Sequence, residues 1–482
     1  MMVHNKQFIL SRKPYIIGED WCMLQMYNGF FLSYQKNLKV VTNSDNSVLL
    51  IGDAWSVNQE IESPQSFIQH LPSFTESLLV QIDEEESIWN GRYLLICGDY
   101  ISLDAIGAYG VYYSQNSLSS SLPLMCHIEN RDVIYPETKW GEFPDFVPGP
   151  YTQIDGVKRI MPSQRYNYVS HKFFYHKFLF PLQDNIEESI LIEELSKMFE
   201  VSLKNMYEHF GRKPIWLALT GGKDSRTALA FLYKVAVPFS VFTFTFSNSS
   251  KLDSKLAKLC AFVCGKKHYT IKKDNTMFSQ KTYEDYKAHT MLMNVDGDSV
   301  LIPHGMYNEL YSLAGKEYLM LRNNAWESIM DYYSAHFETT DELILKLRAN
   351  GKNDKSVDEW LQWVQNDPLN SDISLWDRIF WEQREGCWLS SIEQSLDIME
   401  NMTCVQMCNS RKILAYLHAF PLKKRRAKRH NERLIQVVNH RLYNVPFGDE
   451  LKHDENIYRA WIRKKWPLIW TMLKRGKKLI IH

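Results

Sequence analysis

Cysteine is scarce in this sequence, with eight residues among 482, which excludes a disulfide scaffold as the main source of stability. Long hydrophobic runs are absent: no stretch approaches the ~20 apolar residues of a membrane helix, and the N-terminus lacks the apolar core of a secretory signal. An excess of one charge is missing too, because 56 Lys+Arg balance 56 Asp+Glu, whereas nucleic-acid binders normally carry a basic excess. We therefore expect a cytoplasmic protein with no integral membrane segment and no nucleic-acid partner.

The sequence does contain enough apolar material for full cores, since 45% of its residues are hydrophobic and 13% are aromatic. Its length predicts two to four domains. Residues 1–175 consist mostly of short apolar stretches that end in turn signals, as in 48–51 before Gly52 and 93–97 before Gly98. Such stretches are typical of strands. We predict a layered sheet domain over residues 1–175 and a second domain over residues 186–482.

The second region alternates between two kinds of pattern. The apolar residues of 187–210 have helical spacing, and shorter apolar runs with helical stretches between them follow. Alternation of strand and helix at this spacing predicts a parallel α/β sheet, and the chain after about 277 is predicted to be mainly helical. The predicted elements are a helix over 187–210, strands over 215–219, 239–246 and 268–271, and helices over 226–233 and 253–264.

The segment Leu219–Arg226 has the composition of a phosphate-binding loop. Its two glycines allow close backbone approach, and the N–H groups at the start of the following helix attract anions. Thr220 and Ser225 add hydroxyl donors, and Asp224 adds a carboxylate that can hold Mg²⁺. The alternative is an ordinary strand–turn–helix unit, since the spacings of a Walker loop and of a dinucleotide loop are both absent. We predict that this loop binds ATP with Mg²⁺.

The loop resembles the Ser-Gly-Gly-x-Asp-Ser loop of the ATP pyrophosphatases, with Thr220 in place of the first serine. In that family the loop grips the pyrophosphate end of ATP while a substrate carboxylate attacks the α-phosphorus. The resemblance implies Asp224 as a metal ligand. The nucleotide-binding residues that it implies are Leu219, Thr220, Gly221, Gly222, Asp224, Ser225, Arg226, Thr245 and Phe246.

Within that superfamily, the chain is similar to asparagine synthetase-like proteins over nearly its whole length. Asn90–Ile96, Asp104–Gly107 and Gly156–Ile160 resemble, in order, segments of a glutamine amidotransferase domain, and Phe244–Ser247 resembles a strand of the adenine pocket. The resemblance implies a fold of mixed α/β and α+β class. The N-terminal part would be an αββα sandwich, and the C-terminal part a parallel-sheet ATP pyrophosphatase domain that ends in helices.

One departure from the family concerns the second residue. Glutamine-hydrolysing members need a cysteine as first residue of the mature chain, but Met2 stands here and the nearest cysteine is Cys22. We therefore predict an N-terminal domain that does not hydrolyse glutamine. The β-lactam synthetases and lasso-peptide cyclases, which are similar in layout, share this departure and join a carboxylate to an amine of the same molecule.

A second departure lies downstream, where Trp326 replaces a metal-binding aspartate of the family and Glu327 matches. Glu327 is predicted to orient the amine nucleophile or to contact the metal through water. The alternative is an exposed helix acid. Arg384, together with Asn409–Arg411, is predicted to clamp a carboxylate or phosphate, because guanidinium binds both in bidentate fashion. An isolated arginine is also a common solvated or inter-helix contact.

The family also places a lysine against the α-phosphate in the C-terminal part. Lys423 and Lys424 lie in the matching region, inside the basic run 423–430, and Lys424 is our predicted catalytic lysine. The alternative for this run is a solvated helix face or a phosphate-facing patch.

These features predict an ATP-dependent ligase that adenylates a carboxylate, releases pyrophosphate and directs an amine onto the acyl-adenylate. The substrates would be a small-molecule or peptide carboxylate and an amine. Two alternatives stay open: asparagine synthetase activity with free ammonia, and a catalytically inactive nucleotide-binding scaffold. The N-terminal domain would be a structural or dimerisation platform, which leaves a homodimer open.

Overall fold

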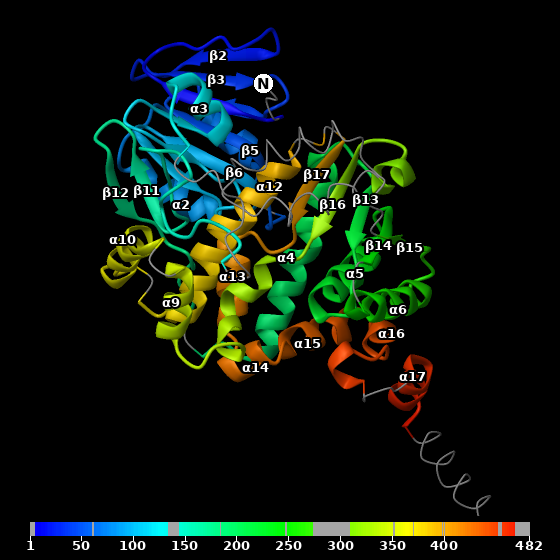
Figure 1. Cartoon of the computed structure of the whole chain (residues 1–482). Coiled ribbons are helices and arrows are strands. Elements are labelled where there is room, and N and C mark those ends of the chain that lie inside the picture. The colour runs from blue at the N-terminus through cyan, green and yellow to red at the C-terminus, as the bar shows by residue number, and fades with distance from the viewer. Residues whose placement is uncertain are drawn as a thin grey trace, which may run out of the picture.

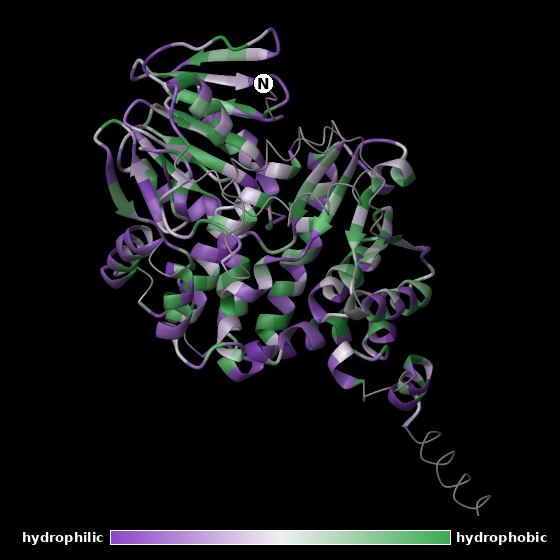
Figure 2. Ribbon diagram, viewed as in Figure 1, coloured by the Kyte–Doolittle hydropathy of each residue, from purple (hydrophilic) through white to green (hydrophobic). Residues whose placement is uncertain are grey.

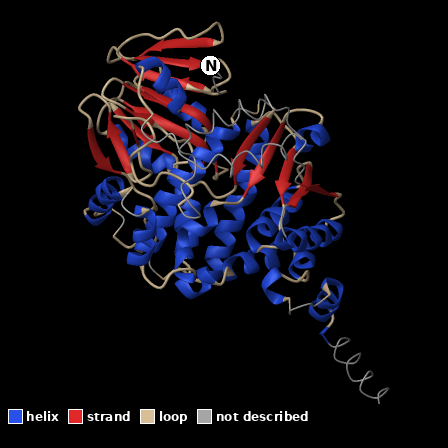
Figure 3. Cartoon of the chain, in the orientation of Figure 1, coloured by secondary structure: helices blue, strands red, loops and turns tan. Residues whose placement is uncertain are grey.

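The computed structural model describes residues 5–59, 62–133, 144–183, 185–245, 248–272, 309–349, 352–369, 371–397, 399, 401–451 and 456–467. Within them, two antiparallel sheets form the N-terminal part, and a parallel sheet with helices forms the C-terminal part (Figures 1 and 3). The predicted order of a layered sheet region and a parallel α/β region is confirmed at this level. The finer domain assignments and the limits 1–175 and 186–482 stay predictions.

The two antiparallel sheets pack face to face because their strands alternate in which side chains they bury. In β5, Leu49 and Ile51 meet Phe8 and Leu32 of the other sheet in one core, while Leu50 faces a second core. The first sheet has the order β10 (Lys158–Arg159), β8 (Tyr112–Tyr113), β9 (Ser117–Ser119), β1 (Phe8–Ser11), β3 (Phe31–Gln35) and β2 (Trp21–Gln25). The second has the order β12 (Lys172–Tyr175), β11 (Gln164–Asn167), β7 (Tyr100–Leu103), β6 (Trp89–Cys97), β5 (Val48–Ser56) and β4 (Val40–Thr42).

Three short helices accompany these sheets: α1 (Pro64–His70), α2 (Leu78–Glu86) and α3 (Leu122–Glu129). Helix α1 lies against β5, and α3 lies against β9. Serine side chains start two of them, since Ser63 caps α1 and Ser121 caps α3 by accepting a backbone N–H of the first turn. The N-terminal part thus has few long helices, as its sequence predicts.

The parallel sheet has the order β15 (His268–Lys272), β14 (Phe239–Thr245), β13 (Ile215–Ala218), β16 (Tyr318–Arg322) and β17 (Met402–Gln406). Figure 2 shows hydrophobic residues along β13 and β16, as expected of strands that helices cover on both faces. After β13 the chain builds outward to β14 and β15, and it then returns to the other side of β13 with β16 and β17. The order therefore reverses between β13 and β16, and ligands of open α/β sheets bind at the carboxyl ends of the strands at such a point.

Helices surround this sheet, and α4 is the longest of those that the structure describes. The face predicted for 187–210 is confirmed, because the apolar residues of α4 at positions 191, 192, 195, 198, 199 and 203 are buried. No helix in the described part of the chain is long and apolar enough to cross a membrane. The helical elements are α4 (Glu188–His209), α5 (Lys223–Val235), α6 (Asn248–Val263), η1 (Ala325–Ile329), η2 (Tyr332–Ala335), α9 (Thr340–Arg348), α10 (Asp354–Gln365), α11 (Leu375–Ile379), the π-helix η3 (Phe380–Leu389), α12 (Ser390–Leu396), α13 (Arg411–His418), α14 (Leu422–Arg426), α15 (Arg429–Val438), α16 (His440–Tyr443), η4 (Gly448–Glu450) and α17 (Ile457–Lys465).

Strands β16 and β17 depart from the mainly helical pattern predicted after residue 277. Both are five-residue runs, and most of their side chains are buried. Periodicity cannot separate a short buried strand from part of a buried helix. The sequence pattern therefore does not predict β16 and β17, which complete the sheet on the far side of β13.

Polar contacts join the N-terminal part to the C-terminal part. Trp55 donates its indole N–H to Ser202 of α4 over 3.0 Å, and the Asn90 amide donates to the Met407 carbonyl over 2.8 Å. The rings of Phe178 and Trp381 stack with centroids 4.0 Å apart. Buried contacts of this kind fix the N-terminal sheets against β17 and the helices beside it.

Candidate functional site

Side chains of the loop after β13 form hydrogen bonds with its own backbone. Ser225 Oγ accepts the Thr220 N–H over 3.1 Å, and Thr220 Oγ1 accepts the Gly222 N–H over 3.2 Å. Helix α5 starts at Lys223, and no side chain caps it. Its first N–H groups therefore lack an intrahelical partner and carry the positive end of the helix dipole. This geometry suits an anion at the carboxyl end of β13.

Gly221 fits its place only because it has no side chain. A Cβ there would lie 2.6 Å from Leu256 Cδ1 and 2.9 Å from Asp253 Oδ1. Leu256 is fully buried, and the same Asp253 oxygen accepts the Gly221 N–H over 2.9 Å. Neither neighbour can retreat without loss of packing or of that hydrogen bond.

A Gly221→Ala chain is therefore expected to lose about 1–3 kcal/mol of free energy of unfolding, as overpacked buried sites do. Gly222→Ala is the matched control, because a Cβ at Gly222 would meet only Thr220 Oγ1, at 3.3 Å, and should cost less than about 1 kcal/mol. Urea unfolding of both chains measures the difference. Equal losses would show that the loop is looser at Gly221 than its contacts indicate.

Three charged side chains meet beside the loop. The Lys428 ammonium forms ion pairs with Asp224, at the start of α5, and with Glu327 Oε1 of η1, the latter over 3.0 Å. Burial and the nearby Asp224 carboxylate raise the pKa of Glu327 to about 7, against the pull of Lys428. Burial opposes the charge of Lys428, but the two carboxylates raise its pKa overall. The group lies where β13 and β16 diverge, because Asp224 follows β13 and Glu327 follows β16.

This group fits a metal-bound polyphosphate. Asp224 Oδ1 is buried and has no hydrogen-bond partner among the described residues, so one carboxylate oxygen is available. No cluster of three His, Cys, Asp or Glu side chains in the described part of the chain could hold a metal ion by itself. Mg²⁺ usually keeps several waters and takes other ligands from phosphate. Asp224 is thus the residue that would hold Mg²⁺ here, together with the phosphates.

The remaining loop residues differ in what they can offer a nucleotide. Leu219 is buried, and its N–H is bound to the Phe242 carbonyl over 2.8 Å. The Thr245 hydroxyl, at the end of β14, is buried without a partner among the described residues. Phe246 lies outside the described residues. Among the described residues, the Thr245 hydroxyl thus keeps a donor and an acceptor for a ligand where the neighbouring strand ends.

Arg226 does not face the anion side of the loop, contrary to the expectation from sequence. Its guanidinium is fully buried and donates to the carbonyls of Val445 over 2.7 Å and Pro446 over 3.0 Å. It also lies over the Phe447 ring at 4.2 Å. Arg226 thus fastens the segment before η4 to α5. It also donates to the loop carbonyl of Gly221 over 3.3 Å, so backbone carbonyls, and not a phosphate, are the partners of its Nη atoms.

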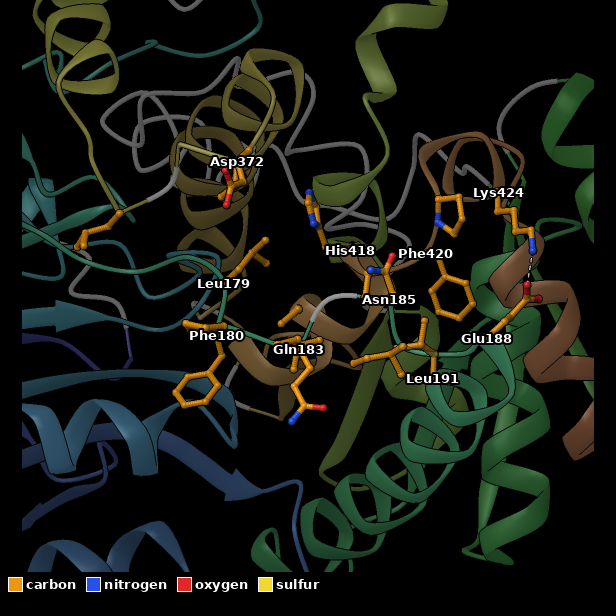
Figure 4. A pocket seen from close by; sticks show the side chains of 18 residues that line it. Leu179, Phe180, Gln183, Asn185, Glu188, Leu191, Asp372, His418, Phe420 and Lys424 are labelled. Atoms are coloured by element: carbon orange, nitrogen blue, oxygen red, sulfur yellow. Dashed lines mark hydrogen bonds and ion pairs between the residues drawn. The ribbon is translucent and has the colours of Figure 1, made fainter.

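Lys424 is not brought to the loop either. Its ammonium pairs with Glu188 at the start of α4, and its side chain is 46% exposed. Figure 4 shows this pair at the edge of a cavity of about 660 Å³ lined by Phe420 and His418. The lysine that contacts Asp224 and Glu327 is Lys428, which the sequence analysis did not single out. Lys428 has a left-handed backbone, φ 50°, between α14 and α15. No local sequence motif predicts that turn.

Arg384 lies on η3 and does not form the predicted clamp with Asn409–Arg411. Its guanidinium stacks on the Trp388 ring at 3.5 Å and pairs with Asp145 over 3.3 Å. Residues 409–411 instead contact the N-terminal part: the Asn409 amide donates to Asp104 over 2.9 Å, and Arg411 pairs with Glu86. Arg384 thus lines a separate cavity that also includes Glu327.

Trp326 stands where the resemblance to asparagine synthetase-like proteins predicts an aspartate. Trp326 is fully buried and points into the core, where its ring lies 5.6 Å from that of Phe199 and 5.8 Å from that of His430. A carboxylate there would be buried among apolar side chains. An unpaired charge at position 326 would be costly in this packing.

Comparisons with known proteins give little beyond this geometry. No family model and no curated protein matches the sequence. Among solved structures, the chain is similar to a glutamine-dependent NAD⁺ synthetase from Acinetobacter baumannii in complex with ADP, with 14% identity over 35% of this chain and 31% of that one and a TM-score of 0.21. An NMN synthetase from Francisella tularensis matches with 14% identity, 56% and 100% coverage and a TM-score of 0.22. A glutamine-dependent NAD⁺ synthetase from Cytophaga hutchinsonii matches with 11% identity, 72% and 62% coverage and a TM-score of 0.22.

These are distant structural resemblances to NAD⁺ and NMN synthetases. The chain spans 31% of the first and 62% of the third of these proteins, and TM-scores near 0.2 do not establish a shared fold. The resemblance to asparagine synthetase-like proteins stays a prediction from the motifs.

Proposed function

We propose that this chain is an ATP-dependent ligase that forms an amide bond from a carboxylate and an amine. The observation that carries the proposal is the meeting of Asp224, Lys428 and Glu327 beside a glycine loop at the reversal point of a parallel sheet. A helix start supplies N–H donors for phosphate oxygens. A lysine and two carboxylates next to it supply the charges that a Mg²⁺–polyphosphate needs.

ATP is a substrate of the proposed reaction. A carboxylate oxygen of the second substrate attacks the α-phosphorus, the bond to the bridging oxygen breaks, and pyrophosphate leaves. The amine then attacks the acyl carbon, the bond to the phosphate oxygen breaks, and AMP leaves. The amine loses one proton in forming the neutral amide, and Glu327 is the carboxylate placed to accept it.

Each residue of the site has a task that follows from its position. The first N–H groups of α5 and the hydroxyls of Thr220 and Ser225 hold phosphate oxygens. Asp224 would hold Mg²⁺, which neutralises phosphate charge when it is bound. Lys428 offers an ammonium, held beside the loop by Asp224 and Glu327, to the negative charge that develops at the α-phosphate.

The N-terminal part takes no chemical role in this proposal. In this proposal the amine comes from a separate or linked substrate group. The buried contacts from β5 and β6 to α4 and the segment after β17 give this part a structural role.

The test is to incubate the full chain with ATP, Mg²⁺ and panels of carboxylic acids and amines, ammonium included, and to measure AMP and pyrophosphate. We expect the two products in equal amounts, and only when an acid is present. Release of ADP and phosphate instead, or of neither product pair with any acid, would contradict the ligase proposal.

Replacing Asp224 by asparagine should weaken Mg²⁺-dependent ATP binding at least about tenfold, since it removes a charged ligand from the metal. Asp358→Asn is the control, because Asp358 forms an exposed pair with Arg348 on α9. Calorimetric titration with and without Mg²⁺ measures both variants. Equal affinity of the Asp224 variant and the control would remove Asp224 from the metal site.

A further inference from the structure

A second cavity adjoins the proposed nucleotide site. Its volume is about 520 Å³, within the range of small-molecule sites. Glu327 belongs to both, because it lines the cavity and also contacts Lys428 beside Asp224. Its lining includes many aromatic rings: Tyr332, Tyr333, His336, Phe337, Phe380 and Trp388.

The π-helix η3 builds one wall of the cavity. Its ten residues, Phe380–Leu389, bond from i to i+5, a rare geometry that is frequent at functional sites. The wider turn allows Phe380, Arg384, Glu385 and Trp388 to line the same space. The opposite wall is aromatic and continuous, since the Tyr332 and Tyr333 rings lie 5.1 Å and 5.5 Å from the Phe380 ring.

Acidic side chains outnumber basic ones among the described lining residues of the cavity. Among its described lining residues, Asp145, Glu327 and Glu385 are carboxylates, and Arg384 alone carries a permanent positive charge. Arg384 is already paired with Asp145. Glu385 is only 2% exposed, and its Oε2 has no hydrogen-bond partner among the described residues. Burial and the neighbouring Glu327 raise the pKa of Glu385 to about 8, against the opposing pull of Arg384 and Arg322, as burial of a carboxylate does.

We infer that this cavity binds the amine substrate of the proposed reaction as an ammonium ion with an aromatic or apolar body. An ammonium group supplies the charge and the donors that Glu385 lacks, and aromatic faces attract both cations and apolar groups. A carboxylate-bearing head would meet repulsion from the cavity acids. The inference rests on the proposed function, for which it names the class of the amine.

Glu327 connects the cavity to the proposed nucleotide site. An amine held by Glu385 lies beside Glu327, and Glu327 lies next to Lys428 and the loop. The bound ammonium gives one proton to Glu385 and becomes a nucleophilic amine, which reaches an activated acyl group formed at the loop without leaving the cavity. Glu327 accepts the second proton as the neutral amide forms. Trp388 closes the side toward Asp145, since its indole N–H donates to that carboxylate over 3.0 Å.

The experiment compares three small probes of similar shape on the full chain without nucleotide: 2-phenylethylamine, 2-phenylethanol and 3-phenylpropionate. Calorimetric titration at about pH 8.5 keeps the amine a cation and Glu385 ionised. We expect the amine to bind at least tenfold more tightly than the alcohol or the acid. Equal or tighter binding of the acid or the alcohol, or no binding of the amine at about 10 mM, overturns the inference.

Glu385→Gln keeps the shape of the side chain and removes its charge, so it should weaken amine binding at least tenfold and leave binding of the alcohol unchanged. Glu359→Gln is the control, because Glu359 forms a pair with Lys158 outside the cavity. An amine affinity equal to that of the control chain overturns the role of Glu385. The comparison of probes on the unaltered chain stands even if the Glu385 variant fails to fold.

The binding experiment uses no ATP, so its result is independent of the ligase assay. A chain that binds the amine and never releases pyrophosphate keeps the cavity assignment and loses the proposed function. A chain that releases pyrophosphate and does not bind the amine keeps the function and loses the cavity assignment.

Discussion

Replacing Lys428 by alanine is expected to lower the rate of pyrophosphate release from ATP at least about 100-fold, as the loss of a preorganised charge donor does in other enzymes. Lys428 is held in place by two carboxylates and by a left-handed backbone between two helices. Its ammonium is therefore already positioned beside the proposed phosphate site. Steady-state assays with saturating ATP measure the loss.

The matched control is Lys424→Ala, four residues away in the same basic run. Lys424 pairs with Glu188 at the surface, and exposed pairs contribute about 0–1 kcal/mol to stability. This variant should keep a rate within about twofold of the unaltered chain. Similar losses in the two variants would show that general positive charge, and not the position of Lys428, sustains the reaction.

The Lys428 variant should still fold. Removing the ammonium leaves Asp224 and Glu327 close together without a cation, but Glu327 already has a pKa of about 7. It can therefore take up a proton near neutral pH and relieve the repulsion. Far-ultraviolet circular dichroism is the check, and an unfolded Lys428 variant would assign this lysine a mainly structural role.

The loop itself was predictable because its signals are local. A strand over 215–219, a glycine turn and a following helix were expected, and the structure has β13 at Ile215–Ala218 and α5 at Lys223–Val235. Apolar runs, glycines and helical spacing all act over a few residues. The same holds for α4, whose buried face follows from its 3.6-residue period.

The charges that complete the site were not predictable, because they depend on tertiary contacts. In the run 423–430, one lysine pairs at the surface, and Lys428 returns to the loop through a left-handed turn. Lys223, inside the loop, turns away to Glu432 and Asp449. Nothing in the sequence distinguishes Lys424 from Lys428 in this respect, since both are lysines in the same basic run.

Residues 409–411 were predicted to bind a ligand, but their tertiary contacts, which the sequence does not reveal, give them another role. A polar Asn-Ser-Arg sequence near the end of a strand is compatible with a ligand clamp, but here the Asn409 amide and the Ser410 hydroxyl contact the N-terminal part. The partners, Asp104 and the Ser87 carbonyl, are more than 300 positions away in sequence. These buried contacts connect the segment after β17 to the N-terminal part.

The strongest of these connections predicts the largest loss of stability. Arg411 Nε pairs with Glu86 Oε2 over 2.8 Å, and the two side chains are 3% and 2% exposed. The same guanidinium donates to the Leu103 carbonyl over 2.9 Å. Arg411→Met leaves Glu86 buried without a cation, and removing one partner of a buried pair typically costs about 3–5 kcal/mol. Urea unfolding, followed by tryptophan fluorescence, measures the loss.

Arg212→Met is the control for that measurement, since Arg212 and its partner Glu208 are 69% and 59% exposed and the change should cost less than about 1 kcal/mol. A double variant with Glu86→Gln and Arg411→Met separates the two sources of the loss. The neutral amide still accepts the Tyr93 hydroxyl, which lies 2.6 Å from Glu86 Oε1, and carries no buried charge. We expect it to recover at least about half of the loss, because most of the cost lies in the charge left unpaired. If the double variant is as unstable as Arg411→Met, the hydrogen bonds of Arg411 to backbone carbonyls, and not its pairing with Glu86, hold the two parts together.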